Sequence, residues 1–316
     1  MKLSIVLTVY NKEQYLRRAF DALLAQEGTS DGDYEILVVN DGSTDGSSAI
    51  IEEIARENKR IRVLSQKNQG LSMARNNGVD NSRGEYVWFV DADDTFSPQA
   101  VKLIIDAIES QPDVIPIYAR FEGIDAIFNC IEPIAENGKD VLLSKWSHCG
   151  VFWVIRKKFL FENDLRFFPG IYHEDSEFTP RMLYAAKTVK VIPHVLYTVD
   201  CDPNSITQVP RPKRAFDCLI VAEHIYDFIE KHNERGSAVG KVLDYNVSVI
   251  INNGFDVIVK NSKEEQCKFN ILLFEKKKLL KCLFASPLLK YRIEAFLFCL
   301  FPRHYVGIYK TMKLFG

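Results

Sequence analysis

The sequence predicts an α/β fold in which a mostly parallel central sheet is flanked by helices and followed by a C-terminal helical appendage. Strand-like apolar runs alternate with amphipathic stretches through the first 110 residues, which is typical of a doubly wound sheet. The last hundred residues show helical spacing only. We expect one domain over 1–205, with halves at 1–110 and 111–205, and a helical extension over 206–316.

In the first half, continuous β-branched and apolar runs predict strands that are covered on both faces, at 3–9, 34–39, 61–64 and 86–90. Apolar residues at helical spacing between these runs predict helices at 12–25, 47–58, 71–77 and 99–110. Because the carboxyl ends of parallel strands meet at one edge of a sheet, the loops that follow these strands should lie together.

The second half is less regular. Strands are expected at 114–121, 150–155 and 189–199, and helices at 157–163, 174–185, 213–232, 239–259 and 269–284. The segment 200–212 carries three prolines and is the best candidate for a hinge or lid.

Composition excludes several classes of protein. A net charge of −2 argues against a general nucleic-acid binder. Seven cysteines at irregular spacings, without a Cys-x-x-Cys pair, are typical of reduced thiols in a cytosolic protein. The first strand begins at Leu3 and leaves no room for a signal peptide, and no apolar run approaches the roughly 20 residues that span a bilayer. We therefore expect a cytoplasmic location.

An acidic cluster, Asp91, Asp93 and Asp94, ends the fourth strand. Like charges at this range raise one another's pKa, so the cluster is best explained by a divalent cation, for which carboxylate oxygens are good ligands. The alternative is a solvated loop after a strand.

Two further features should lie near this edge. Asp41, in the loop 40–46, can accept a hydrogen bond from a base N–H, and Gly42 allows close approach of the backbone. Arg75, one turn into a helix, can pair with a phosphate or stack on a base. The alternatives are turn chemistry with a helix N-cap for Asp41, and a solvated helix face for Arg75.

Glu174 and Asp175 begin the helix predicted at 174–185. Acids at a helix N-terminus also complement the helix dipole, which is the alternative explanation. Aromatic residues nearby (Phe167, Phe168 and Tyr172) indicate a partly desolvated pocket, in which the pKa of a carboxylate rises and its strength as a general base increases.

Five motifs in order resemble the family 2 glycosyltransferases of the GT-A fold: Thr8–Asn11, Asn40–Asp45, Asn68–Gly78, Asp91–Asp94 and Glu174-Asp175. The resemblance covers residues 1 to about 205. It implies an inverting transferase that moves a single sugar from a nucleotide-activated donor, usually a UDP-sugar, with Mn²⁺ or Mg²⁺. The implied acceptor is a glycan or a lipid-linked hydroxyl in surface polysaccharide biosynthesis.

The resemblance also implies roles for individual residues. Asp41 matches the uracil contact, and three residues match the rest of the nucleotide pocket: Thr8, Tyr10 and Arg75. Asp91 and Asp93 match the DxD pair, with Asp91 serving the ribose and Asp93 the metal and diphosphate. Asp175 is our choice for the general base and Glu174 is the runner-up; their order alone does not decide between them.

Two departures from the family pattern limit what carries over. Relatives often place a basic residue soon after the strand that follows the Glu-Asp helix, whereas residues 197–201 contain none. Processive synthases carry Gln-x-x-Arg-Trp, whereas Pro212 stands here in place of the tryptophan. The first departure removes the basis for a leaving-group contact from residues 197–201. The second favours transfer of one sugar.

The tail 275–316 holds nine basic residues against two acidic ones, interleaved with apolar and aromatic residues. Such a segment can lie on an anionic membrane surface, which here would be the inner face of the membrane. The alternative is that its apolar face packs on the catalytic domain or on a sister subunit.

Two other functions compete with glycosyl transfer. Asp91-Ala-Asp-Asp-Thr95 also fits the nucleophile loop of haloacid-dehalogenase-like phosphatases, with Asp91 as nucleophile and Asp93 as acid, although that motif should follow the first strand. The other is a catalytically silent module that binds a sugar nucleotide. Metal-dependent turnover of a UDP-sugar panel separates all three.

Overall fold

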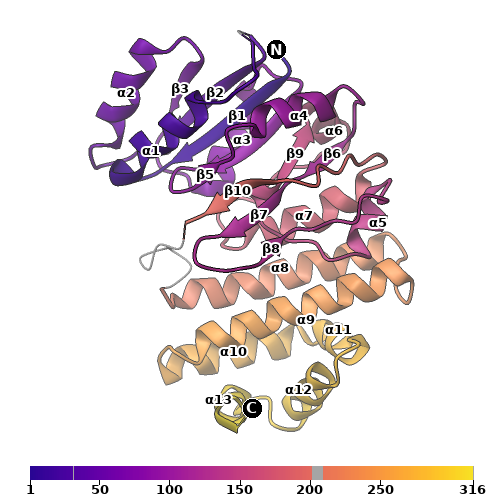
Figure 1. Ribbon diagram of the computed structural model, residues 1–316. Helices are drawn as coiled ribbons and strands as arrows, with labels where there is room; N and C mark the ends of the chain where they lie inside the picture. Colours follow the sequence, from indigo (N-terminus) through magenta and orange to yellow (C-terminus); the bar gives the residue numbers. More distant parts are fainter. Residues whose placement is uncertain (31, 201–208, 316) are drawn as a thin grey trace. The chain divides into compact units, whose positions relative to one another are not determined.

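The computed structural model describes residues 1–30, 32–200 and 209–315. The chain forms two compact units, one built from Met1–Gly170 with Arg181–Asp202 and the other from Ile171–Pro180 with Pro203–Gly316 (Figure 1). The boundary between the units crosses helix α7 (Glu174–Ala185) at Pro180.

A six-stranded sheet forms the centre of the first unit (Figure 1). Its strands, in spatial order, are β3 (Ile61–Ser65), β2 (Tyr34–Asn40), β1 (Leu3–Val9), β4 (Tyr86–Asp91), β9 (Trp153–Arg156) and β6 (Val114–Pro116). The first four are parallel, and β9 runs antiparallel to both of its neighbours. Every residue of β1 and β2 is buried, as their continuous apolar sequences require. The mostly parallel sheet is therefore confirmed.

Four helices lie between or after these parallel strands, at the positions that the apolar spacing predicts: α1 (Glu13–Leu24), α2 (Ser47–Glu57), α3 (Leu71–Asn81) and α4 (Ala100–Ile108). Helix α3 packs directly on β1 through Gly78. A Cβ at that position would lie 2.4 Å from Val6 Cγ1, so only glycine permits the contact.

A second sheet was not expected as such. Its order is β5 (Thr95–Phe96), β10 (Val195–Val199), β7 (Tyr118–Phe121) and β8 (Ile127–Phe128). The single strand predicted at 114–121 is wrong: the chain leaves the first sheet after Pro116, which has no N–H to donate, and enters the second at Tyr118. The strand predicted at 189–199 is strand only over β10, because Pro193 precedes it.

The remaining elements of the first unit are short. The predicted strand 150–155 opens as a 3₁₀ turn, η1 (Gly150–Phe152), before β9 begins. Helices α5 (Gly138–Leu142) and α6 (Lys157–Glu162) complete the irregular middle.

The second unit is helical beyond residue 211. Its elements are α8 (Pro212–Lys231), α9 (Ala238–Ile258), α10 (Lys263–Glu275), η3 (Lys277–Leu279), α11 (Leu280–Ala285), α12 (Leu289–Leu300) and α13 (Tyr305–Phe315). Helices α8 and α9 lie side by side (Figure 1). Ser237 and Ser262 cap α9 and α10 by accepting from Gly240 N and Glu265 N.

The continuous helix predicted at 269–284 is wrong, because the chain turns at three consecutive lysines. The ammonium groups of Lys276 and Lys278 both reach Glu223 on α8, and Lys278 also pairs with Asp227. Pairing with α8 offsets the repulsion among the lysines. Of the hinge candidate 200–212, residues 201–208 lie outside the described residues. None of the helices within the described ranges has the length and apolar character needed to cross a membrane.

Candidate active site

The carboxyl ends of β1, β2 and β4 meet at one edge of the first sheet. The pairing register sets Thr8 opposite both Val39 and Asp91. The loops that follow β1 and β2 are tied together, because Asn11 Oδ1 accepts from Thr44 N at 2.8 Å and Lys12 N donates to Ser47 Oγ at 2.9 Å. The predicted meeting of the polar loops is confirmed.

Asp41 lies at this edge and is 4% exposed. Its carboxylate accepts from Gln66 Nε2 at 2.7 Å, from Gln69 N at 2.8 Å and from Gly70 N at 2.9 Å. A Cβ on Gly42 would lie 2.8 Å from Asn68 N, and the φ of Gly42 is +73°, so glycine is needed for this approach. A carboxylate offers about four acceptor positions, which leaves Asp41 the capacity for one further donor.

Arg75 is buried at 3% exposure and does not lie on a solvated helix face, so that alternative is wrong. Its Nη2 lies 3.5 Å from Asp91 Oδ1, and its Cζ lies 5.3 Å from the ring centroid of Phe167 and 6.0 Å from that of Phe89. Gly150 makes room for the guanidinium, since a Cβ there would lie 3.0 Å from Nη1. The aromatic rings hold the cation at the acidic cluster.

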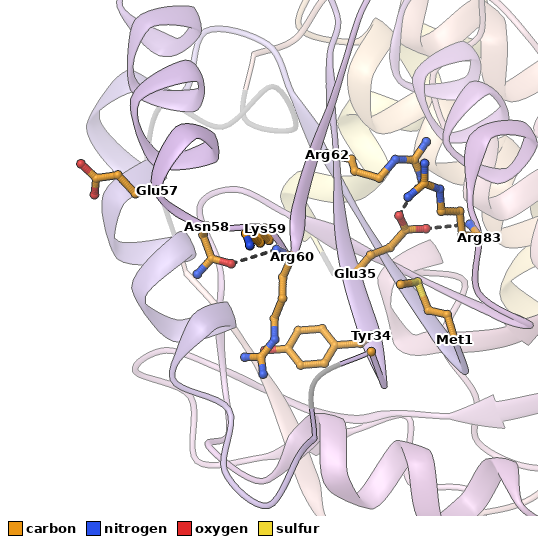
Figure 2. A pocket seen from close by; sticks show the side chains of 10 residues that line it. Met1, Tyr34, Glu35, Glu57, Asn58, Lys59, Arg60, Arg62 and Arg83 are labelled. Carbon is orange, nitrogen blue, oxygen red and sulfur yellow. Dashed lines mark hydrogen bonds and ion pairs between the residues drawn. The ribbon is translucent and has the colours of Figure 1, made fainter.

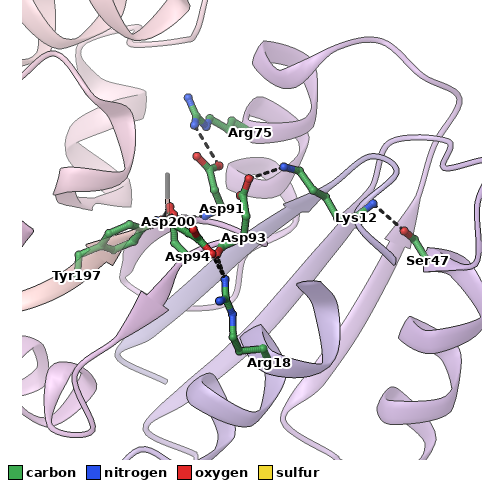
Figure 3. Close-up of polar contacts among 9 residues, drawn as sticks. All are labelled: Lys12, Arg18, Ser47, Arg75, Asp91, Asp93, Asp94, Tyr197 and Asp200. Carbon is green, nitrogen blue, oxygen red and sulfur yellow. Dashed lines mark hydrogen bonds and ion pairs between the residues drawn. The ribbon is translucent and has the colours of Figure 1, made fainter. Parts of the chain in front are cut away.

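The acidic cluster is enclosed by basic side chains (Figure 3). The ammonium of Lys12 pairs with the carboxylate of Asp93. Arg18 donates to the carbonyl oxygen of Asp93 and lies 2.6 Å from an oxygen of Asp200. These contacts, together with the burial of Asp94, exclude a merely solvated loop.

Asp94 is the buried member of the acidic cluster, and its hydrogen bonds hold the loop in place. Tyr197 Oη donates to Asp94 Oδ2 at 2.5 Å and accepts from Asp91 N at 3.1 Å, while Asp200 N donates to Asp94 Oδ1 at 2.9 Å (Figure 3). The pKa of Asp94 is raised to about 8. The larger cause is burial, and the next is the negative charge of Asp91. Burial also raises the pKa of Asp91, while Arg75 lowers it.

The tyrosine that makes these contacts is fixed by aromatic packing. Its ring centroid lies 5.2 to 6.1 Å from those of three edge-on rings, Trp88, Phe96 and Phe152. The second sheet thus shapes the acidic loop that ends β4 in the first.

The carboxylates fit a cation that is shared with a phosphate ligand. Within the described residues, no group of three or more His, Cys, Asp or Glu side chains is arranged to hold a metal by itself. Mg²⁺ in nucleotide sites usually takes one or two carboxylates and fills its other positions with phosphate oxygens and water. Asp91 and Asp93, with side chains 36% and 17% exposed, can supply the protein's share.

Thr8 and Tyr10 also lie at the edge. Thr8 is 9% exposed at the end of β1, and Tyr10, in the loop that follows, is 45% exposed. The structure therefore groups six predicted residues at this edge: Thr8, Tyr10, Asp41, Arg75, Asp91 and Asp93.

Glu174 and Asp175 belong to the second unit, whereas the residues at this edge belong to the first. They open α7; Glu174 is 8% exposed, while Asp175 is partly exposed and accepts from Ser176 N at 2.7 Å. The preceding His173 adopts a left-handed φ of +63°, which is uncommon for histidine. Burial lowers the pKa of His173, and the charge of Asp175 raises it.

Sequence reasoning missed Lys12, Arg18, Tyr197 and Asp200. Lys12 directly follows the polar end of β1, and this position was a usable signal. The others reach the cluster from distant parts of the chain, and nothing local marks them.

The described residues also form a pocket of about 510 Å³ at the opposite edge of the sheet (Figure 2). Tyr34 and Glu35, at the start of β2, line it together with several arginines. Glu35 accepts from Ser4 Oγ, Arg62 Nη1 and Arg83 N, each at 2.6 Å. Neighbouring donors thus occupy the carboxylate of Glu35, and none of the residues that line the pocket belongs to the acidic cluster.

Comparison with known proteins identifies the family. The model of "Glycosyl transferase family 2" matches residues 4–164. The uncharacterized glycosyltransferase EpsJ of Bacillus subtilis (strain 168) is 32% identical over 225 residues, which cover 66% of this chain and 63% of EpsJ. The uncharacterized glycosyltransferase YibD of Escherichia coli (strain K12) is 29% identical over 66% of this chain and 64% of its own. The chain thus spans a little under two thirds of these relatives.

Solved structures show the same fold. S. aureus TarS 1-349 in complex with UDP-GlcNAc matches with a TM-score of 0.69 at 22% identity, over 98% of this chain and 88% of that one. The mannosyltransferase PcManGT from Pyrobaculum calidifontis, in complex with GDP-Man and Mn²⁺, matches with a TM-score of 0.56 at 14% identity, over 97% and 86%. The fold is the GT-A fold, and the chain belongs to glycosyl transferase family 2.

Proposed function

We propose that this protein is an inverting glycosyltransferase that moves one sugar from a nucleoside-diphosphate donor, a UDP-sugar, to a hydroxyl of a glycan or lipid-linked acceptor in surface polysaccharide biosynthesis. The observation that carries the proposal is the edge of the first sheet, where the buried carboxylate of Asp41, the buried guanidinium of Arg75 and two partly exposed carboxylates converge. The UDP-GlcNAc and UDP held by TarS support a uridine donor.

The donor's nucleotide binds along this edge. Asp41 accepts a hydrogen bond from the base N–H with its remaining lone pair, and its three existing hydrogen bonds fix the orientation of the carboxylate. Thr8 and Tyr10 line the nucleotide pocket, and Asp91 accepts from the ribose hydroxyls. Arg75 offers its charge to the donor from a position that Phe89 and Phe167 fix.

Asp93, with Asp91, would hold Mn²⁺ or Mg²⁺ against the diphosphate. When bound, the cation supplies positive charge that neutralises the departing nucleoside diphosphate. The ammonium of Lys12 already lies at Asp93 and adds a second positive charge at the same place. The Mn²⁺ in PcManGT supports a metal in this kind of site.

The acceptor hydroxyl attacks the anomeric carbon from the face opposite the diphosphate. A bond forms between the acceptor oxygen and the anomeric carbon, the bond from that carbon to the phosphate oxygen breaks, and the hydroxyl proton passes to a carboxylate. We assign that carboxylate to Asp175, with Glu174 as runner-up. Asp175 is partly exposed whereas Glu174 is 8% exposed, so Asp175 is the more accessible of the two carboxylates.

The phosphatase alternative is wrong for this chain. Its motif should follow the first strand, but Asp91 ends β4, and the chain belongs to glycosyl transferase family 2. We also propose a reducing, cytoplasmic setting. Cys218 and Cys282 are buried free thiols whose pKa is raised by burial, as is usual for core cysteines that stay reduced.

A panel of nucleotide sugars with Mn²⁺ tests the proposed function. We expect release of UDP from at least one UDP-sugar, lost when EDTA removes the metal and faster when a glycan acceptor is present. Asp41→Ala should abolish the release because it removes the base acceptor. If no nucleotide sugar is turned over but UDP still binds, the protein is a silent binding module and the transferase proposal fails.

A further inference from the structure

Helix α12 presents apolar side chains on the face away from its own packing partners. The inner face consists of buried residues: Tyr291, Glu294, Ala295 and Phe298. The outer face carries four apolar residues that are between 44% and 66% exposed: Leu289, Ile293, Phe296 and Leu300. We refer to these four residues as the apolar stripe.

The stripe is narrow and flanked by cations. At about 100° per residue, its four side chains fall within an arc of roughly 60° along three turns. Lys290 and Arg292, both exposed, project to either side of that arc. Long basic side chains in this position can keep their charged ends in a polar layer while the stripe enters an apolar one.

The chain segment that carries the stripe exposes charge of a single sign. Nine of the twenty large apolar side chains that are exposed in the described residues lie within 271–301, so the patch is concentrated there. Exposed cations accompany them, among them Lys281, Arg303 and Lys310. Between residues 276 and 313 the only carboxylate is that of Glu294, which is 2% exposed.

The charge of this segment distinguishes between two partners that could cover the apolar stripe, a second copy of the chain and an anionic surface. The spacing of the stripe would also suit the seam of a coiled coil with a second copy of the chain. A symmetric pairing, however, sets this basic segment against the same basic segment of the other copy, and the segment exposes no carboxylate that could pair with Lys290 and Arg292. An anionic surface matches every exposed charge of the segment 276–313.

We propose that the apolar stripe and its flanking cations dock on an anionic lipid bilayer, with α12 lying in the plane of the interface. Docking does not require the transferase activity. It provides a reason why the acceptor can be lipid-linked, since the enzyme and such an acceptor would share one surface.

Flotation of the full-length protein tests this proposal, with vesicles of phosphatidylcholine alone and of phosphatidylcholine mixed equally with phosphatidylglycerol. We expect binding to the anionic vesicles only. Lys290→Gln with Arg292→Gln should lower the partition coefficient about 30-fold, because two cations leave the surface. Ile293→Ser with Phe296→Ser should lower it at least about tenfold. The matched control is Ile134→Ser, which changes an 86% exposed isoleucine of the first unit and should bind as the parent does.

Three results would overturn the proposal: no binding of the parent to anionic vesicles, equal binding by the Ile293→Ser, Phe296→Ser variant, or a dimer in sedimentation velocity that this variant dissociates. The last would assign the stripe to self-association. UDP release with a water-soluble acceptor, measured on the same variants, should match the parent. A failure of docking is thereby distinguished from a failure of the proposed transferase function.

Discussion

Tyr197 joins two parts of the acidic loop through one hydroxyl. The hydroxyl accepts from Asp91 N and donates to Asp94, which is 4% exposed. Tyr197→Phe should therefore lower the free energy of unfolding by about 1–3 kcal/mol, since it leaves two polar groups unsatisfied. Urea unfolding of the two proteins measures this change. Tyr10→Phe, at a 45% exposed site, is the control and should stay within about 0.5 kcal/mol of the parent. Equal losses of unfolding free energy in the two variants would show that the hydrogen bonds of Tyr197 do not stabilise the acidic loop.

Asp175 and Glu174 can be separated by isosteric substitution. Asp175→Asn should reduce the transfer rate by a factor of about 10² or more while UDP binding, measured by calorimetry, stays close to that of the parent. Glu174→Gln should retain most of the rate. If Asp175→Asn turns over normally and Glu174→Gln does not, the runner-up is the base.

Residue types and their positions in the sequence indicated part of the candidate site. The part that they did not indicate depends on contacts between distant positions of the chain. Asp41, Asp91 and Asp93 lie at or just after a strand end, and Arg75 lies one turn into a helix, so the local pattern indicates all four. Tyr197 meets Asp94 across 103 positions of sequence, and its role depends on a tertiary contact that no local pattern encodes.

At the scale of elements, α9, α12 and α13 share a buried polar cluster. Glu294 on α12 accepts from Asn252 Nδ2 with both oxygens, at 3.1 and 3.0 Å, and lies 3.8 Å from Lys290 Nζ. Tyr309 Oη lies 2.9 Å from Asn252 Oδ1 and 2.5 Å from Asp256 Oδ1, and it can donate its single proton to one of them at a time. The cluster holds the inner face of the helix that carries the apolar stripe.

Burial raises the pKa of Glu294 from 4.5 to about 7. Between these values the folded state holds a proton that the unfolded chain has lost, so this group makes the protein less stable as pH rises from about 4.5 to about 7. Above that range the loss is constant at about 3 kcal/mol. Glu294→Gln should therefore raise the melting temperature at pH 8 and change it little at pH 5. An equal shift at both pH values would show that the carboxyl group does not titrate in this way.

The shortness of some elements explains where the prediction of strands fails. The long runs of β1, β2 and β4 carry enough apolar residues to be recognised, and their parallel pairing follows from the helices between them. Strands β5 and β8 have two residues each, too few for any periodicity, so the second sheet could not be foreseen.

At the scale of the whole molecule, the donor should stabilise the first unit when a cation is present. The carboxylates of the acidic loop repel one another, and the Mn²⁺ that accompanies a nucleoside diphosphate supplies further positive charge beside them. We expect UDP with Mn²⁺ to raise the melting temperature of the parent, and to raise that of Asp93→Asn much less, in a thermal shift assay. Equal shifts for both proteins would exclude Asp93 as a ligand.

A crystal soaked with UDP and manganese, with anomalous scattering used to locate the metal, tests the central claim most directly. We expect the uracil ring beside Asp41, the diphosphate near Lys12 and Arg75, and the manganese within coordination distance of an Asp93 oxygen. Nucleotide density elsewhere than at the joint carboxyl edge of β1, β2 and β4 would contradict the assignment of the site.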